Sequence, residues 1–250
     1  MTSQYYCKTI ATTDPVDSYY AAKNERADNI PEANSTRTKR GIGEHTKYWA
    51  PGKTLKVLVC TYDEHSFQAV KNAANKWLPY VNLKFDFFEM EEEDIYQSEE
   101  FLGDIRVDFN PLYDGSGSSK LGTDSLTGSP HQASMVLGTD FSSDRFEFRG
   151  VHEFGHALGL QHEHQHPDAG IPFDREKTYT YFGHLGFTRT DVETNVFAFE
   201  RVPGRTYEPY DSQSVMHYSI PDSITMGDWS HAGNSQISAG DIAFMRKIYP

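Results

Sequence analysis

Residues 152–162 read HEFGHALGLQH, and this stretch carries the strongest structural and chemical signal in the chain. His152 and His156 are four residues apart, so a helix would place both imidazoles on one face, one turn apart. Two imidazoles in that arrangement can bind one metal ion at about 2.0–2.1 Å. Gly159 accepts the positive φ that ends a helix without steric penalty. The chain can therefore turn back there and bring His162 to the same ion.

Three histidine ligands would leave the fourth position of a tetrahedral zinc ion to water, which is the arrangement of a catalytic site rather than a structural one. Glu153 neighbours His152 in the sequence and is not needed as a ligand. Its carboxylate can take a proton from water whose pKa a zinc ion lowers to about 7. The spacing therefore predicts one zinc ion per chain, bound by His152, His156 and His162, with Glu153 as the general base.

The composition of the whole chain is that of an ordinary globular protein. Of its 250 residues, 37% are hydrophobic and 24% are charged, and the formal net charge is −13. A balance this negative argues against nucleic acid or an anionic membrane as the main partner, since both need a basic face. The apolar runs are as short as Val57–Cys60, so we expect no membrane span.

The chain before the histidine segment alternates between strand and helix patterns. Strands are expected at four places, which are Leu55–Val59, Val81–Phe87, Ile105–Phe109 and Ala133–Leu137. A helix is expected from Asp63 to Leu78, and residues 114–119, DGSGSS, are expected to be a flexible loop. The chain after residue 165 is irregular until Ser238 and Asp241, which form a capping box before a closing helix.

The segment 152–162 resembles the extended signature HExxHxxGxxH of the metzincin zinc metallopeptidases. These enzymes also carry a methionine turn downstream, and Ser214–Tyr218, SVMHY, stands where that turn is expected. Glu163 directly after the third histidine, and the tyrosine that ends the turn, are similar to the astacin branch. The order of the expected elements from Trp49 to Pro250 resembles the astacin-like peptidases of bacteria and fungi.

This resemblance implies an α+β fold of the two-lobed metzincin type. We expect a twisted, mostly parallel sheet with an antiparallel edge strand and two long helices in the N-terminal lobe, and a loop-rich C-terminal lobe that ends in a helix. The catalytic domain would cover residues 46–250, with lobes at 46–162 and 163–250. Residues 1–45 would be an N-terminal extension, either a pro-segment or a packing arm. Ala133–Leu137 stands where metzincins keep the edge strand that pairs with substrate.

The resemblance also implies roles for three further residues. Met216 would form an apolar floor beneath the metal. Tyr218 would be a fifth ligand that swings away on substrate binding and donates a hydrogen bond to the oxyanion. Glu163 matches the residue that receives the freed N-terminus in astacins, although it could instead pair with a nearby arginine or a backbone N–H. The long chain upstream of the first strand leaves that maturation step open.

Cys7 and Cys60 are the two cysteines of the chain, too few for the two disulfides that are usual in astacins. Three arrangements are open: Cys7 blocks the zinc as a thiolate in a latent form, the two cysteines form a disulfide, or both stay as unpaired thiols. Met1–Ile10 has no apolar core of the kind that a signal peptide needs. The family resemblance nevertheless leads us to expect a secreted, extracellular protein.

Together these features predict a zinc-dependent endopeptidase, a metalloprotease that hydrolyses peptide bonds with a metal-activated water. We expect a protein or peptide substrate, a monomer and no nucleic-acid partner. The alternative is a host- or partner-directed effector or binding protein that uses a metzincin scaffold, with narrow or no proteolysis.

Overall fold

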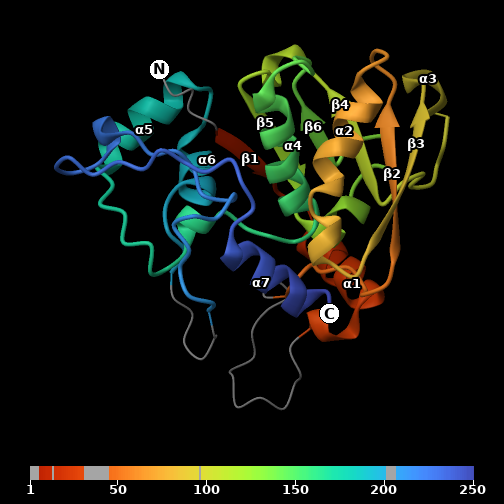
Figure 1. Ribbon diagram of the computed structural model, residues 1–250, viewed down its shortest axis with the longest axis horizontal. Helices are drawn as coiled ribbons and strands as arrows, with labels where there is room; N and C mark the ends of the chain where they lie inside the picture. Colours follow the sequence, from red (N-terminus) through yellow and green to blue (C-terminus); the bar gives the residue numbers. More distant parts are fainter. Residues whose placement is uncertain (1–5, 13, 31–44, 96, 201–206) are drawn as a thin grey trace. The chain divides into compact units, whose positions relative to one another are not determined.

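The computed structural model describes residues 6–12, 14–30, 45–95, 97–200 and 207–250, which form two compact units. The sheet unit consists of Thr9–Leu160 and Met245–Pro250, and the loop unit consists of Met1–Lys8 and Gln161–Phe244. Figure 1 labels the helices and strands of both. Within the described ranges, no helix is both long enough and apolar enough to cross a membrane.

The described part of the sheet unit is built on a sheet with the strand order β1-β5-β6-β4-β2-β3 (Figure 1). The strands are β1 (Tyr6–Ile10, of which Thr9 and Ile10 belong to this unit), β2 (Thr54–Cys60), β3 (Lys84–Met90), β4 (Ile105–Phe109), β5 (Ser116–Lys120) and β6 (Met135–Leu137). Strand β2 pairs in parallel with β3 and β4, β4 pairs in parallel with β6, and β5 pairs antiparallel with β6. The predicted α+β class with a mostly parallel sheet is therefore confirmed.

Strand β2, which lies between β4 and β3, is buried on both faces along Val57–Val59, as its apolar sequence TLKVLVC favours. Leu55, Val57 and Val59 are fully buried, and Leu58 on the opposite face is also buried. Val57 pairs with Ile105 of β4 in the register of the parallel ladder. This apolar centre of the sheet supports the strands next to it, which position the site.

Two sequence predictions about this sheet are wrong. Residues 114–119 do not form a flexible loop, because Ser116–Lys120 is strand β5. The predicted edge strand Ala133–Leu137 contains β6, which lies inside the sheet between β5 and β4. Strand β5 has the sequence SGSSK, so its buried positions carry small polar side chains and show no apolar alternation. Periodicity of apolar residues is the signal by which strands are recognised, and it is missing here.

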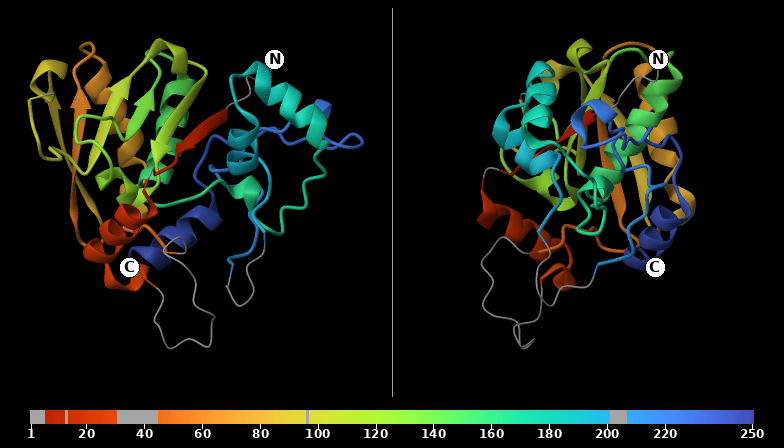
Figure 2. Two further views of the ribbon diagram at one scale, coloured as in Figure 1. Left: turned by 180° about the vertical axis from the view of Figure 1, so that it is seen from behind. Right: turned by 90° about the vertical axis from the view of Figure 1, so that its left-hand side faces the viewer.

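Helices α2 and α4 lie side by side over one face of the sheet, and the view from behind in Figure 2 shows the strands in front of them. The helices of this unit are α1 (Pro15–Glu25), α2 (Ser66–Asn75), α3 (Glu92–Ile95) and α4 (Asp144–Ala157), with short 3-10 turns at Ala27–Asn29, Leu78–Tyr80, Pro111–Tyr113 and Gly122–Leu126. A Cβ atom on Gly150 would lie 2.6 Å from the Cβ of Ala73. This glycine therefore allows α4 to pack closely on α2.

Helix α1 was not predicted, although Asp14-Pro15 is a standard start of a helix. The Asp14 side chain accepts the Val16 N–H at 2.7 Å, and Pro15 occupies the first turn. The helix has weak apolar periodicity, with Ala22 fully buried and Tyr20 exposed, so a pattern search misses it.

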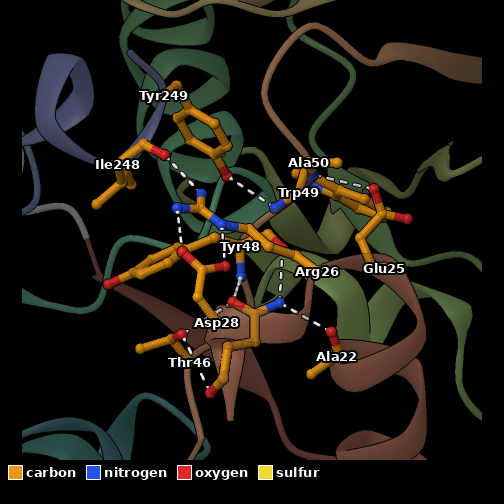
Figure 3. A network of polar contacts seen from close by, with 11 residues as sticks. Ala22, Glu25, Arg26, Asp28, Thr46, Tyr48, Trp49, Ala50, Ile248 and Tyr249 are labelled. Carbon is orange, nitrogen blue, oxygen red and sulfur yellow. Dashed lines mark hydrogen bonds and ion pairs between the residues drawn. The ribbon is translucent and has the colours of Figure 1, made fainter. Parts of the chain in front are cut away.

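Polar contacts join α1 and the turn after it to the rest of the sheet unit (Figure 3). Arg26 pairs with Asp28 and also donates to the Ile248 carbonyl at 2.6 Å. Glu25 accepts the Ala50 N–H at 3.0 Å and pairs with Lys53 at 2.7 Å. Residues 14–30 are thus a packed part of this unit.

The loop unit has short helices connected by long irregular segments, and one of these segments contains the methionine turn Ser214–Tyr218. Its helices are α5 (Arg175–His184), α6 (Arg189–Asn195) and the first residues of α7 (Ala239–Ile248), with 3-10 turns at Glu163–Gln165 and Asp222–Ile224. The predicted capping box at the start of α7 is confirmed, since Ser238 accepts the Asp241 N–H and Asp241 accepts the Ser238 N–H, each at 2.9 Å.

Candidate metal centre

Helix α4 carries His152, Glu153 and His156, and all three side chains are fully buried. The rings of His152 and His156 face each other edge to face, with centroids 4.9 Å apart. The helix holds this arrangement because its apolar stripe, which includes Val151 and Phe154, packs into the core. The two imidazoles therefore lie on one face, at a spacing that suits one shared ion.

The tautomer of His156 follows from its hydrogen bond. Its Nδ1 lies 2.7 Å from the Leu160 carbonyl oxygen, which can only accept, so Nδ1 carries the proton and Nε2 the lone pair. Burial lowers the pKa of this imidazole to about 4. His156 is therefore neutral at neutral pH, as a zinc ligand has to be.

The end of helix α4 is fixed by two large buried side chains of the same unit. Trp49 donates its indole N–H to the Ala157 carbonyl at 2.8 Å, and Tyr249 donates its hydroxyl to the Leu158 carbonyl at 2.7 Å. Gly159 follows with a φ of +98°, and a Cβ there would lie 2.7 Å from the Tyr48 ring. Only glycine suits this position, because it accepts a positive φ without strain and has no Cβ to collide with Tyr48. The chain can therefore turn sharply here.

Strand β5 presses against the carboxylate of Glu153. A Cβ atom on Gly117 would lie 2.5 Å from Oε1 of Glu153 and 2.9 Å from its Cγ. The backbone of β5 thus comes as close to this side chain as a residue without a side chain permits. The backbone of Gly117 therefore packs directly on the Glu153 side chain and limits where its carboxylate can lie.

Replacing Gly117 with Ala is expected to displace the Glu153 carboxylate and to lower kcat about 10²-fold, since a misplacement of about 1 Å in a catalytic group has that effect. Zinc content and the melting temperature should change little. The matched control is Gly115→Ala, because a Cβ on Gly115 meets no atom within 4 Å. Equal loss of activity in both variants would contradict this account of Gly117.

His162 lies in the loop unit, next to Cys7 and Gln165. Its Nδ1 is 3.3 Å from the side-chain oxygen of Gln165, which accepts, so Nε2 carries the lone pair. That Nε2 lies 2.9 Å from Sγ of Cys7, which is itself almost fully buried. In His162, Nδ1 is hydrogen-bonded to a neighbouring side chain and Nε2 faces a thiol. This is the local arrangement of a histidine that binds a metal through Nε2.

The turn Ser214–Tyr218 is held by Asp241. Its carboxylate accepts the Ser214 hydroxyl at 2.6 Å and the Val215 N–H at 2.9 Å. Burial raises the pKa of Asp241. Met216 in the middle of the turn is buried, and its carbonyl accepts the Glu163 N–H at 3.1 Å. The turn is therefore tied both to the start of α7 and to the residue after His162.

Tyr218 is buried against His164, with the two rings stacked at 4.0 Å. Its hydroxyl donates to the Cys7 carbonyl and accepts the Cys7 N–H at 3.3 Å. His217 supports the turn from the other side: its Nδ1 lies 2.7 Å from the Tyr218 carbonyl and its Nε2 lies 2.8 Å from the Tyr210 hydroxyl. The Tyr218 hydroxyl is thus a polar group aimed at a segment of extended backbone.

Glu163 accepts the Asp211 N–H at 2.7 Å through its carboxylate. A backbone N–H is one of the partners that the sequence left open for Glu163, beside an arginine and a freed N-terminus. Burial raises the pKa of the Glu163 carboxyl to about 7.

The two cysteines are thiols and form no disulfide, which excludes one of the three arrangements that the sequence left open. Cys7 is buried in the loop unit, whereas Cys60 ends strand β2 and is half-buried. Burial raises the pKa of the Cys60 thiol to about 11, so this group is not a reactive thiolate at neutral pH.

Sequence reasoning missed Gly117, the role of Asp241 at the turn and the contacts of the N-terminal residues. The capping box at Ser238 identified Asp241 as a helix cap but gave no sign that its carboxylate also reaches Ser214. Gly117 stands in a Gly- and Ser-rich stretch that has the composition of a loop. Neither contact leaves a local pattern in the sequence.

Comparison with known proteins bears on the family. No protein-family model matches the chain. It is 34% identical to the protein in "Structure of myroilysin", over 82% of this chain and 96% of that one, with a TM-score of 0.69. A second structure, "Crystal structure of myroilysin", is 33% identical over 82% of this chain and 86% of that one, with a TM-score of 0.60.

Two more distant proteins agree in fold or sequence. High choriolytic enzyme 1, a hatching enzyme zinc-protease from Oryzias latipes, shares the fold with a TM-score of 0.52 at 17% identity, over 81% of this chain and 94% of that one. Tolloid-like protein 1 of Homo sapiens is 24% identical over 92% of this chain, which spans 21% of that protein's length. With the histidine helix and the methionine turn, the likeness to the two myroilysin structures establishes that this chain belongs to the astacin-like branch of the metzincin zinc metallopeptidases.

Proposed function

We propose that this protein is a zinc endopeptidase that hydrolyses peptide bonds with Glu153 as the general base. The observation that carries the proposal is the buried group on helix α4, where two facing imidazoles flank a carboxylate that the backbone of β5 holds in position. A zinc peptidase needs metal ligands and a general base, and this helix supplies two histidines and a carboxylate. Hydrolysis with a metal-activated water is the chemistry that it supports best.

The donor set fits zinc. Cys7, His152, His156 and His162 are candidate ligands among the described residues, and all four are buried. Neutral imidazole nitrogens are ordinary zinc ligands, and three of them define a catalytic site with an open position. The hydrogen bonds that His156 makes to Leu160 and His162 makes to Gln165 place the lone pair of each ring on Nε2. We therefore assign one zinc ion per chain to His152, His156 and His162.

A bound zinc ion would polarise the scissile carbonyl and lower the pKa of water to about 7. Glu153 takes the proton of the attacking water and passes it to the leaving amine. The Tyr218 hydroxyl, once released from the Cys7 backbone, would be a further ligand for the metal in the resting enzyme. On substrate binding it would swing away and donate a hydrogen bond to the developing oxyanion. Met216 serves as the apolar floor of the site.

The catalytic domain in this proposal covers residues 46–250, and residues 1–45 are an N-terminal extension. We expect a monomeric, secreted protein that acts on polypeptides. The alternative, a binding protein without proteolysis, would have no need for the buried carboxylate and the glycine that positions it. Those two residues favour the enzyme.

Digestion of unfolded casein by the zinc-loaded protein tests the proposal. We expect fragments in the absence of a chelator and none after treatment with 1,10-phenanthroline, with activity restored by added zinc. Release of peptides that the chelator leaves unchanged, or no release by the zinc-loaded chain with Cys7→Ala, would contradict it.

The contacts of Cys7 further support a latent form. Its sulfur lies 2.9 Å from His162 and its backbone groups meet the Tyr218 hydroxyl, so Cys7 engages two of the residues assigned to the metal site. Thiolate is a strong zinc ligand and would take the position that water needs. In this proposal Cys7 has to leave His162 and Tyr218 before catalysis begins.

Replacing Cys7 with Ala is expected to raise the rate of casein hydrolysis by the full chain at least about tenfold, because activity scales with the fraction of molecules whose site is accessible. The matched control is Cys60→Ala, which removes the other thiol and should leave the rate unchanged. Initial rates before any N-terminal processing, checked by mass spectrometry, provide the measurement. A Cys7→Ala chain as slow as the parent would show that the thiol does not hold the enzyme latent.

A further inference from the structure

The N-terminal arm, defined here as Tyr6, Cys7 and Lys8, seats three consecutive side chains in the loop unit. As part of strand β1 it is extended, so Tyr6 and Lys8 point to one side and Cys7 to the other. Side chains two residues apart on a strand lie about 6.5–7 Å from each other along the chain. Each of the two flanking side chains enters its own set of contacts.

Tyr6 enters an aromatic pocket and is only 6% exposed. Its ring meets Phe182, Tyr218 and Tyr181 edge to face, with centroids at 4.9, 5.5 and 6.0 Å. Its hydroxyl lies 3.0 Å from that of Tyr181. Edge-to-face contacts of this kind favour an aromatic occupant over an aliphatic one of equal size.

Lys8 enters an acidic pocket at the surface, where its side chain is 36% exposed. Its ammonium donates to Asp191 at 3.0 Å and to the Gly186 carbonyl at 3.2 Å, and it lies 4.4 Å from the centre of the Phe187 ring. A carboxylate, a carbonyl oxygen and an aromatic face together attract a positive charge. This combination selects lysine or arginine and disfavours an acidic side chain.

Cys7, which lies between Tyr6 and Lys8, contacts two residues that we assign to the metal site. The Cys7 backbone meets the Tyr218 hydroxyl with both its N–H and its carbonyl, and its sulfur meets His162. A polypeptide whose backbone takes this place would present its neighbouring side chains to the same two pockets. We infer that these pockets are substrate subsites, and that the enzyme prefers polypeptides with an aromatic and a basic residue separated by one position.

This inference rests on the proposed function, because it takes His162 and Tyr218 to be part of the metal site. The net charge of −13 agrees with it, since an acidic protein attracts basic substrates at long range.

Binding of labelled peptides tests the inference without relying on turnover. The protein is the full zinc-loaded chain with Tyr6→Ala, Cys7→Ala and Lys8→Ala, which empties both pockets, and with Glu153→Gln to prevent cleavage. The peptides share one sequence except for a core of Tyr-Ala-Lys, Tyr-Ala-Met or Tyr-Ala-Glu, and a second series reverses each core, since a substrate can run in either direction. Fluorescence anisotropy gives each Kd.

The lysine core is expected to bind about fivefold more tightly than the methionine core in one of the two series, and the glutamate core more weakly still. Asp191→Asn should remove the preference for lysine. Asp191 belongs to the capping box at the start of α6. Asp174→Asn is the matched control, because Asp174 likewise caps a helix of this unit and pairs with Lys177, but has no contact with the arm among those described. It should keep the preference.

A lysine-to-methionine ratio below about twofold in both series, or a ratio that Asp191→Asn leaves unchanged, would overturn the inference. If the triple variant loses its fold by circular dichroism, the double variant Cys7→Ala and Lys8→Ala empties the acidic pocket for the same comparison. Failure of the proposed function gives a different result. The arm variant with Glu153 intact would then cleave no peptide, while the binding ratio would still decide whether the Lys8 pocket is a binding site for a basic residue.

Discussion

Replacing Glu153 with Gln is expected to lower the rate of peptide hydrolysis about 10³-fold or more while the protein keeps its zinc and its fold. General-base catalysis contributes about 10²–10⁴-fold, and an amide cannot take the proton. The substitution is nearly isosteric, so the close approach of Gly117 to this side chain is preserved. Because the carboxylate is not assigned as a ligand, the zinc content should stay at about one ion per chain.

The measurement is kcat/KM for casein or a fluorogenic peptide, together with metal analysis and a thermal melt of the same samples. Glu147→Gln is the matched control: Glu147 lies on the same helix, exposed to solvent, and pairs with Lys76 at 3.0 Å. That variant should keep the parent rate. Activity retained by Glu153→Gln would remove Glu153 from the mechanism, whereas loss of zinc in that variant would show that the carboxylate is a ligand.

Replacing His156 with Gln is expected to abolish both zinc binding and hydrolysis. His156 is fully buried, and its hydrogen bond to the Leu160 carbonyl directs Nε2 as the donor atom. Loss of one of three ligands leaves an incomplete site, and the activity that depends on the metal should fall by at least about 10³-fold. Glutamine keeps much of the side chain's volume, so the core around α4 should remain packed.

Zinc content after dialysis against a weak chelator and the rate of casein hydrolysis provide the measurements. The control His65→Gln removes an exposed histidine that precedes α2 and should change neither. A His156→Gln chain that still binds one zinc ion per molecule and hydrolyses casein at the parent rate would exclude His156 from the metal site. A melting temperature that no longer rises on adding zinc is expected as well, since a ligand stabilises only the state that binds it.

The features that the sequence predicted correctly depend on residues close together in the chain. The spacing of His152 and His156 places them on one helical face because an α-helix repeats every 3.6 residues. The same holds for the capping box at Ser238, which needs only the three residues that follow it. Strand β2 was recognised because a strand buried on both faces is a continuous apolar run.

The tertiary structure decided the features that join residues distant in sequence. Strand β5 has the sequence SGSSK and contacts Glu153 through Gly117, so no apolar alternation marks it and its composition predicts a loop. Helix α1 is held mainly by polar contacts such as that of Arg26 with the Ile248 carbonyl, 222 residues away, and its weak apolar pattern gave no signal. Such contacts follow from the folded chain and not from any local repeat.

The sequence by itself predicted the family correctly and indicated the zinc chemistry that we propose, because the spacing of His152, Glu153 and His156 on one helix is a local property. Only the tertiary structure decided which group positions Glu153, which residues meet Cys7, and that Asp191 receives the ammonium of Lys8. Each of these is a contact between side chains or backbone far apart in sequence. Their closeness depends on how the strands, helices and turns pack, and that packing is a property of the whole fold.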